Sequence, residues 1–127
     1  MNKGIGLDIC DVSRMEKLLQ DDRFLNRYFT PGEIEYIRSR GHGAGCSLAG
    51  LFASREALGK ALGTGIDFDL KEAEIRHTAE GAPFYHLSGK LKQRVGNDRL
   101  HLSISHDGGF AAAVCLIESV SDEGGIK

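Results

Sequence analysis

The sequence predicts a single α+β domain in which an antiparallel sheet packs on one long helix. Three observations lead to this fold class. The chain has 127 residues, the length of one compact domain, with 41% hydrophobic and 27% charged residues, as is typical of globular proteins. Segments in which apolar and polar residues alternate, as in strands, lie near both ends of the chain, and the longest helical pattern lies between them. We expect the domain to span residues 1–118 and residues 119–127 to form a flexible tail.

The first predicted element is a strand at residues 5–10. Its side chains alternate, so that Ile5, Leu7 and Ile9 share one face and Asp8 lies on the other. Aspartate is disfavoured in strands, and the glycine two residues before it leaves room for a ligand beside the carboxylate. The alternative is that Asp8 caps a backbone group at the strand end, and the pattern alone leaves both interpretations open.

Start and stop signals predict the helices. The clearest start is Thr30-Pro31-Gly32-Glu33, where Thr30 caps the helix and Glu33 completes a capping box. Glycines predict a loop at residues 41–45, and Gly63 begins the turn that ends the long helix. Helices are expected at residues 12–19, 24–29, 31–40, 47–62 and 89–95, the last capped by Ser88.

The second half of the chain supplies the remaining strands. Residues 71–78 and 84–87 flank a turn, and a hairpin turns at the Asp-Gly-Gly of residues 107–109. Residues 110–117 are apolar on both faces, which predicts a central strand, whereas residues 100–105 alternate between apolar and polar.

Composition excludes several function classes. The 16 basic and 18 acidic residues give a net charge of -2, which argues against general nucleic-acid binding. The three cysteines are an odd number without CxxC spacing, so they indicate reduced thiols rather than a disulfide framework or a zinc site. The N-terminus lacks the pattern of a signal peptide, and no apolar run approaches the ~20 residues that span a bilayer. We therefore expect a cytoplasmic protein without a membrane partner.

Two charged side chains stand out on the long helix. Glu56 and Lys60 are four residues apart and share a helix face. Alone they are an ordinary exposed ion pair, worth roughly 0.2–0.5 kcal/mol. Together with Asp8 they would supply two carboxylates and a cation. That set suits a magnesium ion with substrate phosphates, the usual equipment of phosphoryl transfer.

Hydroxyl and imidazole groups cluster at residues 103–107, Ser-Ile-Ser-His-Asp, before the last turn. Such a cluster indicates ligand contacts or a polar strand face. A hydrolase triad is disfavoured because no GxSxG motif is present and adjacent strand residues point to opposite faces.

Four blocks of the sequence, taken in order, resemble the holo-acyl-carrier-protein synthases. They are Gly-Ile-Gly-Leu-Asp-Ile at residues 4–9, followed by Arg14; Phe-Ala-Ser-Arg-Glu-Ala-Leu-Gly-Lys-Ala-Leu-Gly-Thr-Gly at 52–65; Gly-Ala-Pro at 81–83; and Leu-Ser-Ile-Ser-His-Asp at 102–107. The resemblance runs from about residue 4 to residue 118, and it implies a 4'-phosphopantetheinyl transferase-like fold. It also implies a homotrimer with active sites at the subunit interfaces.

The same resemblance implies the reaction. Phosphopantetheine would pass from coenzyme A to a serine of an apo acyl carrier protein of fatty acid (lipid) or polyketide biosynthesis, with release of 3',5'-ADP and with magnesium as cofactor. Asp8 and Glu56 would bind the metal, and Glu56 and Lys60 would act in catalysis, Glu56 by helping to deprotonate the serine. The implied coenzyme A contacts are Lys60, Gly63, Pro83, Ser105 and His106.

The carrier protein is expected to be acidic and to meet basic residues of the first helical region. Arg14, Lys17 and Arg23 are the candidate contacts, with Arg14 the strongest. The alternative is a solvated helix face, since acidic residues are interleaved with the basic ones.

Two residues depart from the family pattern. Arg55 replaces a lysine, and Leu51 replaces an arginine found in many members. If that arginine meets a nucleotide phosphate, Arg40 or Arg55 would have to take its place here. Two rival functions also remain at this stage: a magnesium-dependent phosphohydrolase that uses the same residues with water as acceptor, and a non-catalytic module that binds the carrier protein.

Overall fold

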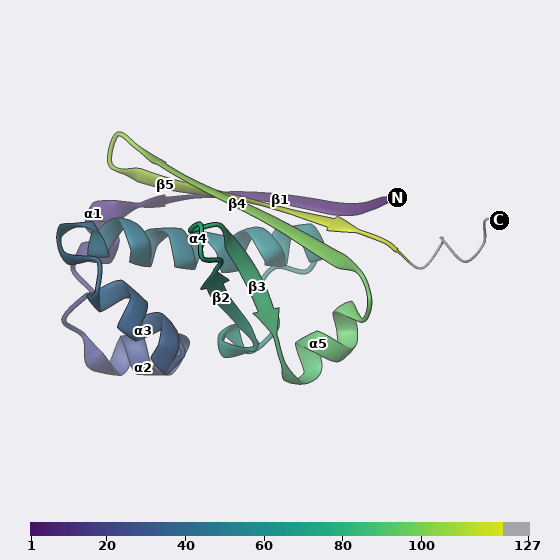
Figure 1. Ribbon diagram of the computed structural model, residues 1–127, viewed down its shortest axis with the longest axis horizontal. Helices are drawn as coiled ribbons and strands as arrows, with labels where there is room; N and C mark the ends of the chain where they lie inside the picture. The colour runs from purple at the N-terminus through teal and green to yellow at the C-terminus, as the bar shows by residue number, and fades with distance from the viewer. Residues whose placement is uncertain (121–127) are drawn as a thin grey trace.

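In the computed structural model, which describes residues 1–120, the long helix α4 (Ala44–Leu62) lies along one face of a three-stranded antiparallel sheet (Figure 1). The strand order is β1-β5-β4, so β5 is central, as the sequence predicts. These strands are β1 (Asn2–Asp11), β4 (Arg99–Asp107) and β5 (Phe110–Glu118). The α+β fold class is therefore confirmed. Within the described residues, no helix is long and apolar enough to span a bilayer.

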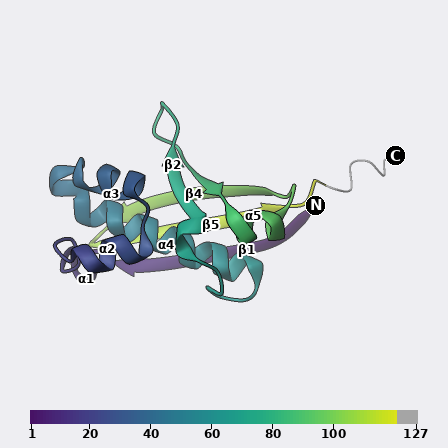
Figure 2. The ribbon, with the colours of Figure 1, turned by 90° about the horizontal axis from the view of Figure 1, so that it is seen from below.

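The smaller elements surround α4. Three short helices gather at one end of the molecule, and a separate two-stranded sheet, β2-β3, lies below α4 in Figure 1 (Figures 1 and 2). The predicted antiparallel sheet is thus divided into two sheets. The remaining elements are α1 (Val12–Glu16), α2 (Asp22–Tyr28), α3 (Pro31–Arg38), η1 (Gly41–Gly43), η2 (Leu70–Glu72), β2 (Ala73–His77), β3 (Pro83–Leu87) and α5 (Gly89–Val95).

The contact between β1 and α4 is made by residues with little or no side chain. A Cβ atom on Gly6 would lie 1.9 Å from the carbonyl oxygen of Ala57, and one on Gly4 would lie 2.1 Å from that of Ala61. The strand backbone therefore rests directly on the helix. The predicted alternation of β1 is confirmed, and its larger apolar side chains point away from α4.

Several element boundaries differ from the predictions. The helix expected at residues 12–19 ends at Glu16, because the chain continues in single turns in which Leu18 N–H donates to Met15 O. The long helix begins three residues earlier than expected. Gly45, which the sequence places in a loop, belongs to this helix and is buried. The side chain of Glu16 packs against it so closely that a Cβ at Gly45 would lie 2.3 Å from Cγ of Glu16.

The segment between α4 and α5 also differs. The strand expected at residues 71–78 begins only after the 3₁₀ turn η2. Ser88 is the N-cap of α5, but its side chain makes no capping hydrogen bond. Glu72 takes that part, since its Oε1 accepts from Leu91 N–H at 2.9 Å. In contrast, the capping box of Thr30 and Glu33 is present as predicted.

The N-terminal residue pairs with the backbone just after β5. Ser119 N–H donates to Met1 O at 2.8 Å, so the predicted tail begins with a paired residue. The rest of that prediction, residues 121–127, lies outside the described residues.

We expect Gly6→Ala to lower the free energy of unfolding by about 1–3 kcal/mol, because the new methyl group must push β1 away from α4. Urea denaturation followed by circular dichroism measures this. Gly50→Ala is the matched control. Its Cβ would meet side-chain atoms of Ile104 at 3.1 Å and His106 at 3.3 Å, which can shift. Helix-interior alanine also gains up to about 1 kcal/mol over glycine, so stability should hold. Equal losses in both variants would contradict this account of the contact.

Candidate active site

Asp8 and Lys60 meet where β1 crosses the C-terminal half of α4. Because Gly4 and Gly6 lie against successive turns of the helix, Asp8 continues the same strand face to the next turn. Its side chain is 17% exposed, and Nζ of Lys60 lies 3.4 Å from its Oδ1. The same Nζ donates to Leu7 O at 3.0 Å. The lysine thus bridges the strand and the helix.

Glu56 joins this pair from the preceding turn of α4. Burial raises the pKa of the Glu56 carboxyl, and the negative charge of Asp8 raises it further, while Lys60 and Arg14 oppose the shift. The two carboxylates are therefore close enough to repel each other. The structure brings together the three residues that the sequence analysis selected for phosphoryl transfer.

The donor set fits magnesium. Two carboxylate groups supply hard oxygen ligands, and their mutual repulsion is relieved when a divalent cation lies between them. Residues 1–120 contain no cluster of three or more His, Cys, Asp or Glu side chains arranged to hold a metal. Substrate oxygens and water would therefore have to complete the coordination shell, as is usual for magnesium bound with phosphates.

Arg14 lies closer to the carboxylates than its place on a basic helix face suggests. Its Nη2 donates to Sγ of Cys10 at 3.7 Å, and its guanidinium stands 5.9 Å from the centre of the Phe52 ring. Lys17 and Arg23 are exposed on the same region of the chain. Of the three predicted carrier contacts, Arg14 lies near enough to Glu56 for its charge to lower the pKa of that carboxyl.

Pro83 and His106 line a second site, a cavity of about 140 Å³ beside the N-terminal half of α4. Nε2 of His106 lies 3.0 Å from Cys46 O. Tyr36 and His77 also line this cavity, with their rings stacked 4.2 Å apart. This stack could not be predicted from the sequence, because the two residues are 41 positions apart and stand on different elements.

Ser105 and Gly63 occupy other positions. Ser105 lines a shallow cavity of about 340 Å³ on the sheet face that points away from α4, next to Ile9 and Phe110. Gly63 ends α4 with a left-handed backbone, φ +84°, and its N–H donates to Lys60 O at 3.1 Å. Gly63 therefore stands at the C-terminal end of α4, near Gly4 rather than Asp8 on β1.

Within one chain the predicted residues thus form two groups. Asp8 is on β1 and His106 is on β4, and these strands are the two edges of the sheet with β5 between them. Asp8, Glu56 and Lys60 lie at the β1 edge, and Ser105 and His106 lie on β4 with Pro83 nearby. Gly63 belongs to neither group, because it stands at the C-terminal end of α4.

One alternative from the sequence analysis is wrong in this structure. Arg55 is completely buried and paired within the protein, so it is not available to a nucleotide phosphate. Arg40 is exposed, and its guanidinium lies 5.4 Å from the centre of the Tyr36 ring at the cavity that Pro83 lines. Of the two arginines considered, only Arg40 is accessible.

Comparison with known proteins gives consistent matches over most of the chain. Residues 4–115 match the profile of the family described as the 4'-phosphopantetheinyl transferase superfamily. The holo-[acyl-carrier-protein] synthase of Treponema denticola is 44% identical over 119 residues, covering 91% of this chain and 97% of that protein.

Solved structures give the same result. The holo-(acyl-carrier-protein) synthase of Bacillus anthracis in complex with CoA (3',5'-ADP) has a TM-score of 0.79 and 36% identity, covering 94% of this chain and 98% of that one. The Helicobacter pylori holo-[acyl-carrier-protein] synthase in complex with coenzyme A has a TM-score of 0.77 and 37% identity, covering 90% and 99%.

The raised pKa of Glu56 predicts a pH-dependent stability. A carboxyl that holds its proton more tightly when folded destabilises the folded chain once it ionises, as pH rises through the folded pKa. We expect Glu56→Gln to raise the urea midpoint of the metal-free protein at about pH 7. The gain should shrink toward about pH 4, below the ordinary glutamate pKa of about 4.3. Glu35→Gln, at an exposed position on α3, is the control. A midpoint lowered at neutral pH would contradict the prediction.

Proposed function

We propose, for a chain that belongs to the holo-acyl-carrier-protein synthase family of 4'-phosphopantetheinyl transferases, a magnesium-dependent transfer of phosphopantetheine from coenzyme A to a serine of apo acyl carrier protein. As a member of this family the chain is an enzyme, and coenzyme A and acyl carrier protein are its substrates. The proposal adds the metal requirement, the release of 3',5'-ADP and the roles of individual residues.

The observation that carries the proposal is the meeting of Asp8, Glu56 and Lys60 from two elements that are far apart in sequence. Asp8 and Glu56 would hold the magnesium ion. When bound, this ion neutralises negative charge that develops on the pyrophosphate oxygens of the substrate. Lys60, whose side chain is 54% exposed, can turn its ammonium from Asp8 toward a phosphate oxygen.

The chemical step is a substitution at phosphorus. The serine oxygen of the carrier bonds to the β-phosphorus, the bond from that phosphorus to the bridging oxygen breaks, and 3',5'-ADP leaves with the electron pair. Glu56 receives the serine proton, directly or through water. Its raised pKa supports this assignment, because a carboxylate whose pKa lies closer to neutrality is the stronger base.

The carrier protein is proposed to dock on the basic residues of α1 and α2. Arg14 acts electrostatically on Glu56, and Lys17 and Arg23 are exposed on the same helical region, so an acidic carrier bound there would bring its serine toward Glu56. Complementary charge of this kind mainly speeds encounter and sets orientation.

We further propose a homotrimer in which each active site is shared between subunits. One chain separates Asp8, Glu56 and Lys60 from the coenzyme A contacts Pro83, Ser105 and His106, and a second copy would reunite the two groups. The outer sheet face offers an apolar surface for this contact. Its large side chains are 50–68% exposed: Ile5, Leu7, Ile9 and Phe110.

The proposed location is the cytoplasm. Cys10, Cys46 and Cys115 are all free, which is typical of proteins in a reducing compartment.

The transfer itself is tested with purified protein, coenzyme A, magnesium and apo carrier, followed by the mass of the carrier. We expect the wild type to add one phosphopantetheine per carrier and Glu56→Gln to lose transfer while remaining folded, because the amide neither accepts the proton nor carries the charge of a metal ligand. Release of phosphate or nucleotide without a gain in carrier mass would favour the rival phosphohydrolase. Wild-type rates in Glu56→Gln would overturn the role of this residue.

Assembly is tested with Ile5→Glu, which places a charge in the outer sheet face. We expect sedimentation to show a shift from trimer to monomer and transfer to fall with it, because the shared site is lost. Phe84→Glu is the control for assembly, since Phe84 is 40% exposed but lies on β3, away from that face. A monomeric wild type with full activity would refute the shared site.

A further inference from the structure

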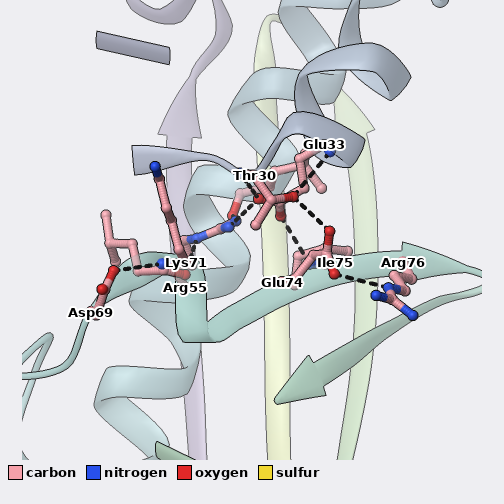
Figure 3. Close-up of polar contacts among 10 residues, drawn as sticks. Thr30, Glu33, Arg55, Asp69, Lys71, Glu74, Ile75 and Arg76 are labelled. Atoms are coloured by element: carbon pink, nitrogen blue, oxygen red, sulfur yellow. Dashed lines mark hydrogen bonds and ion pairs between the residues drawn. The ribbon is translucent and has the colours of Figure 1, made fainter. Parts of the chain in front are cut away.

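Arg55 is a charged side chain in the interior of the protein, one position before Glu56 on α4. No part of it is exposed to solvent. Its guanidinium pairs with the Glu33 carboxylate, and it also donates to Leu70 O at 3.1 Å and to Leu51 O at 3.3 Å (Figure 3). The ring of Phe29 packs over the same group, 4.8 Å from ring centre to guanidinium carbon. Its contacts thus come from four separate segments of the chain.

Glu33 joins this arginine to the rest of the fold. One carboxylate oxygen accepts from Thr30 N–H at 3.0 Å as part of the capping box, and the other accepts from Ile75 N–H at 2.9 Å (Figure 3). The pair of Glu33 and Arg55 therefore ties α3, α4 and β2 together. Among residues 1–120 it is the ion pair whose two side chains are both fully buried.

Net stability is a weak reason for such a pair. Taking two charges out of water costs several kcal/mol, and well-packed apolar residues often do as well or better. The pair instead fixes an orientation. The planar guanidinium donates hydrogen bonds in fixed directions, so its partners hold the Arg55 side chain in one orientation.

The contact between α4 and β1 leaves the rotation of α4 about its own axis to be fixed by other contacts. It consists of glycine backbone on alanine, with Gly6 against Ala57, which sets how closely the strand approaches the helix. The other buried residues of α4 are mostly apolar, and apolar contacts are non-directional, whereas the hydrogen bonds of Arg55 have fixed directions. Successive helix side chains point about 100° apart, so any rotation that moves Arg55 moves Glu56 by the same angle.

We propose that Arg55, held by Glu33, is a positioning residue that sets the rotation of α4 and so aims the Glu56 carboxylate at Asp8. The inference rests on the proposed function of the two carboxylates. Arg55 contacts neither substrate nor metal, and it acts only through the helix that also carries Glu56.

The test uses Arg55→Lys, with Mn²⁺ in place of magnesium. Lysine keeps the charge and can pair with Glu33, but it does not have the fork that also reaches the carbonyls of Leu70 and Leu51. We expect the Kd for Mn²⁺, measured by electron paramagnetic resonance with coenzyme A at saturation, to rise about 10- to 100-fold. The kcat for transfer should fall with it, whereas the KM for coenzyme A should not change.

Three further variants separate positioning from stability. Arg76→Lys alters the neighbouring pair with Glu74, whose carboxylate also accepts from Thr30 Oγ1 on the α3 side, and should bind Mn²⁺ as the wild type does. Leu91→Ala opens the core at α5 and should lower the Tm without weakening Mn²⁺ binding. Glu33→Gln removes one acceptor of the same pair and should weaken Mn²⁺ binding, which gives a second test if Arg55→Lys does not fold.

Wild-type Mn²⁺ affinity in folded Arg55→Lys or folded Glu33→Gln would overturn the proposal, as would an equal loss of affinity in Leu91→Ala. Failure of the proposed function has a different signature. In that case Glu56→Gln would bind Mn²⁺ as tightly as the wild type, whatever the behaviour of the Arg55 variant.

Discussion

The contact between β1 and α4 is made of glycine backbone and alanine carbonyls, and the position of the candidate site follows from it. With Gly4 and Gly6 resting on the helix, the next residue on that strand face, Asp8, is carried to the turn of α4 that bears Glu56. A larger residue at position 6 would separate the strand from the helix and the two carboxylates from each other. The proposed pairing of Asp8 with Glu56 thus depends on the absence of side chains at Gly4 and Gly6.

The same contact reverses the usual placement of apolar residues in an edge strand. The small residues of β1 face the interior, and Ile5, Leu7 and Ile9 face outward. A single chain therefore exposes an apolar sheet surface in the same element that holds Asp8. This arrangement places the proposed metal ligand Asp8 one residue away from the surface proposed for assembly, so that the two proposed functions of β1 are separated only by the alternation of its side chains.

Much of the fold was predictable because local signals agreed with the tertiary structure. The capping box at Thr30 and the central strand at residues 110–117 follow from short patterns, and the family resemblance is carried by blocks that the comparisons confirm. The early start of α4 was not predictable, because Gly45 signals a loop unless its packing against Glu16 is known. Nor was the burial of Arg55, since a charged residue indicates an exposed position until its partner 22 residues away is in place.

The candidate site was only partly predictable for a similar reason. The spacing of Glu56 and Lys60 and the oddity of Asp8 were enough to select the three residues, but their meeting depends on which strand face lies on α4. The division of the remaining contacts between the β1 and β4 edges depends on β1 being the second neighbour of β5, which the sequence pattern does not contain.

That strand order has a genetic consequence in the proposed closed assembly. Each subunit would contribute its β1 edge to one site and its β4 edge to another. A chain defective at Asp8 and a chain defective at His106, produced together, would form some mixed rings with one site intact and another doubly damaged. Two inactive alleles of one gene could then complement each other, because β5 separates the β1 and β4 edges within each subunit.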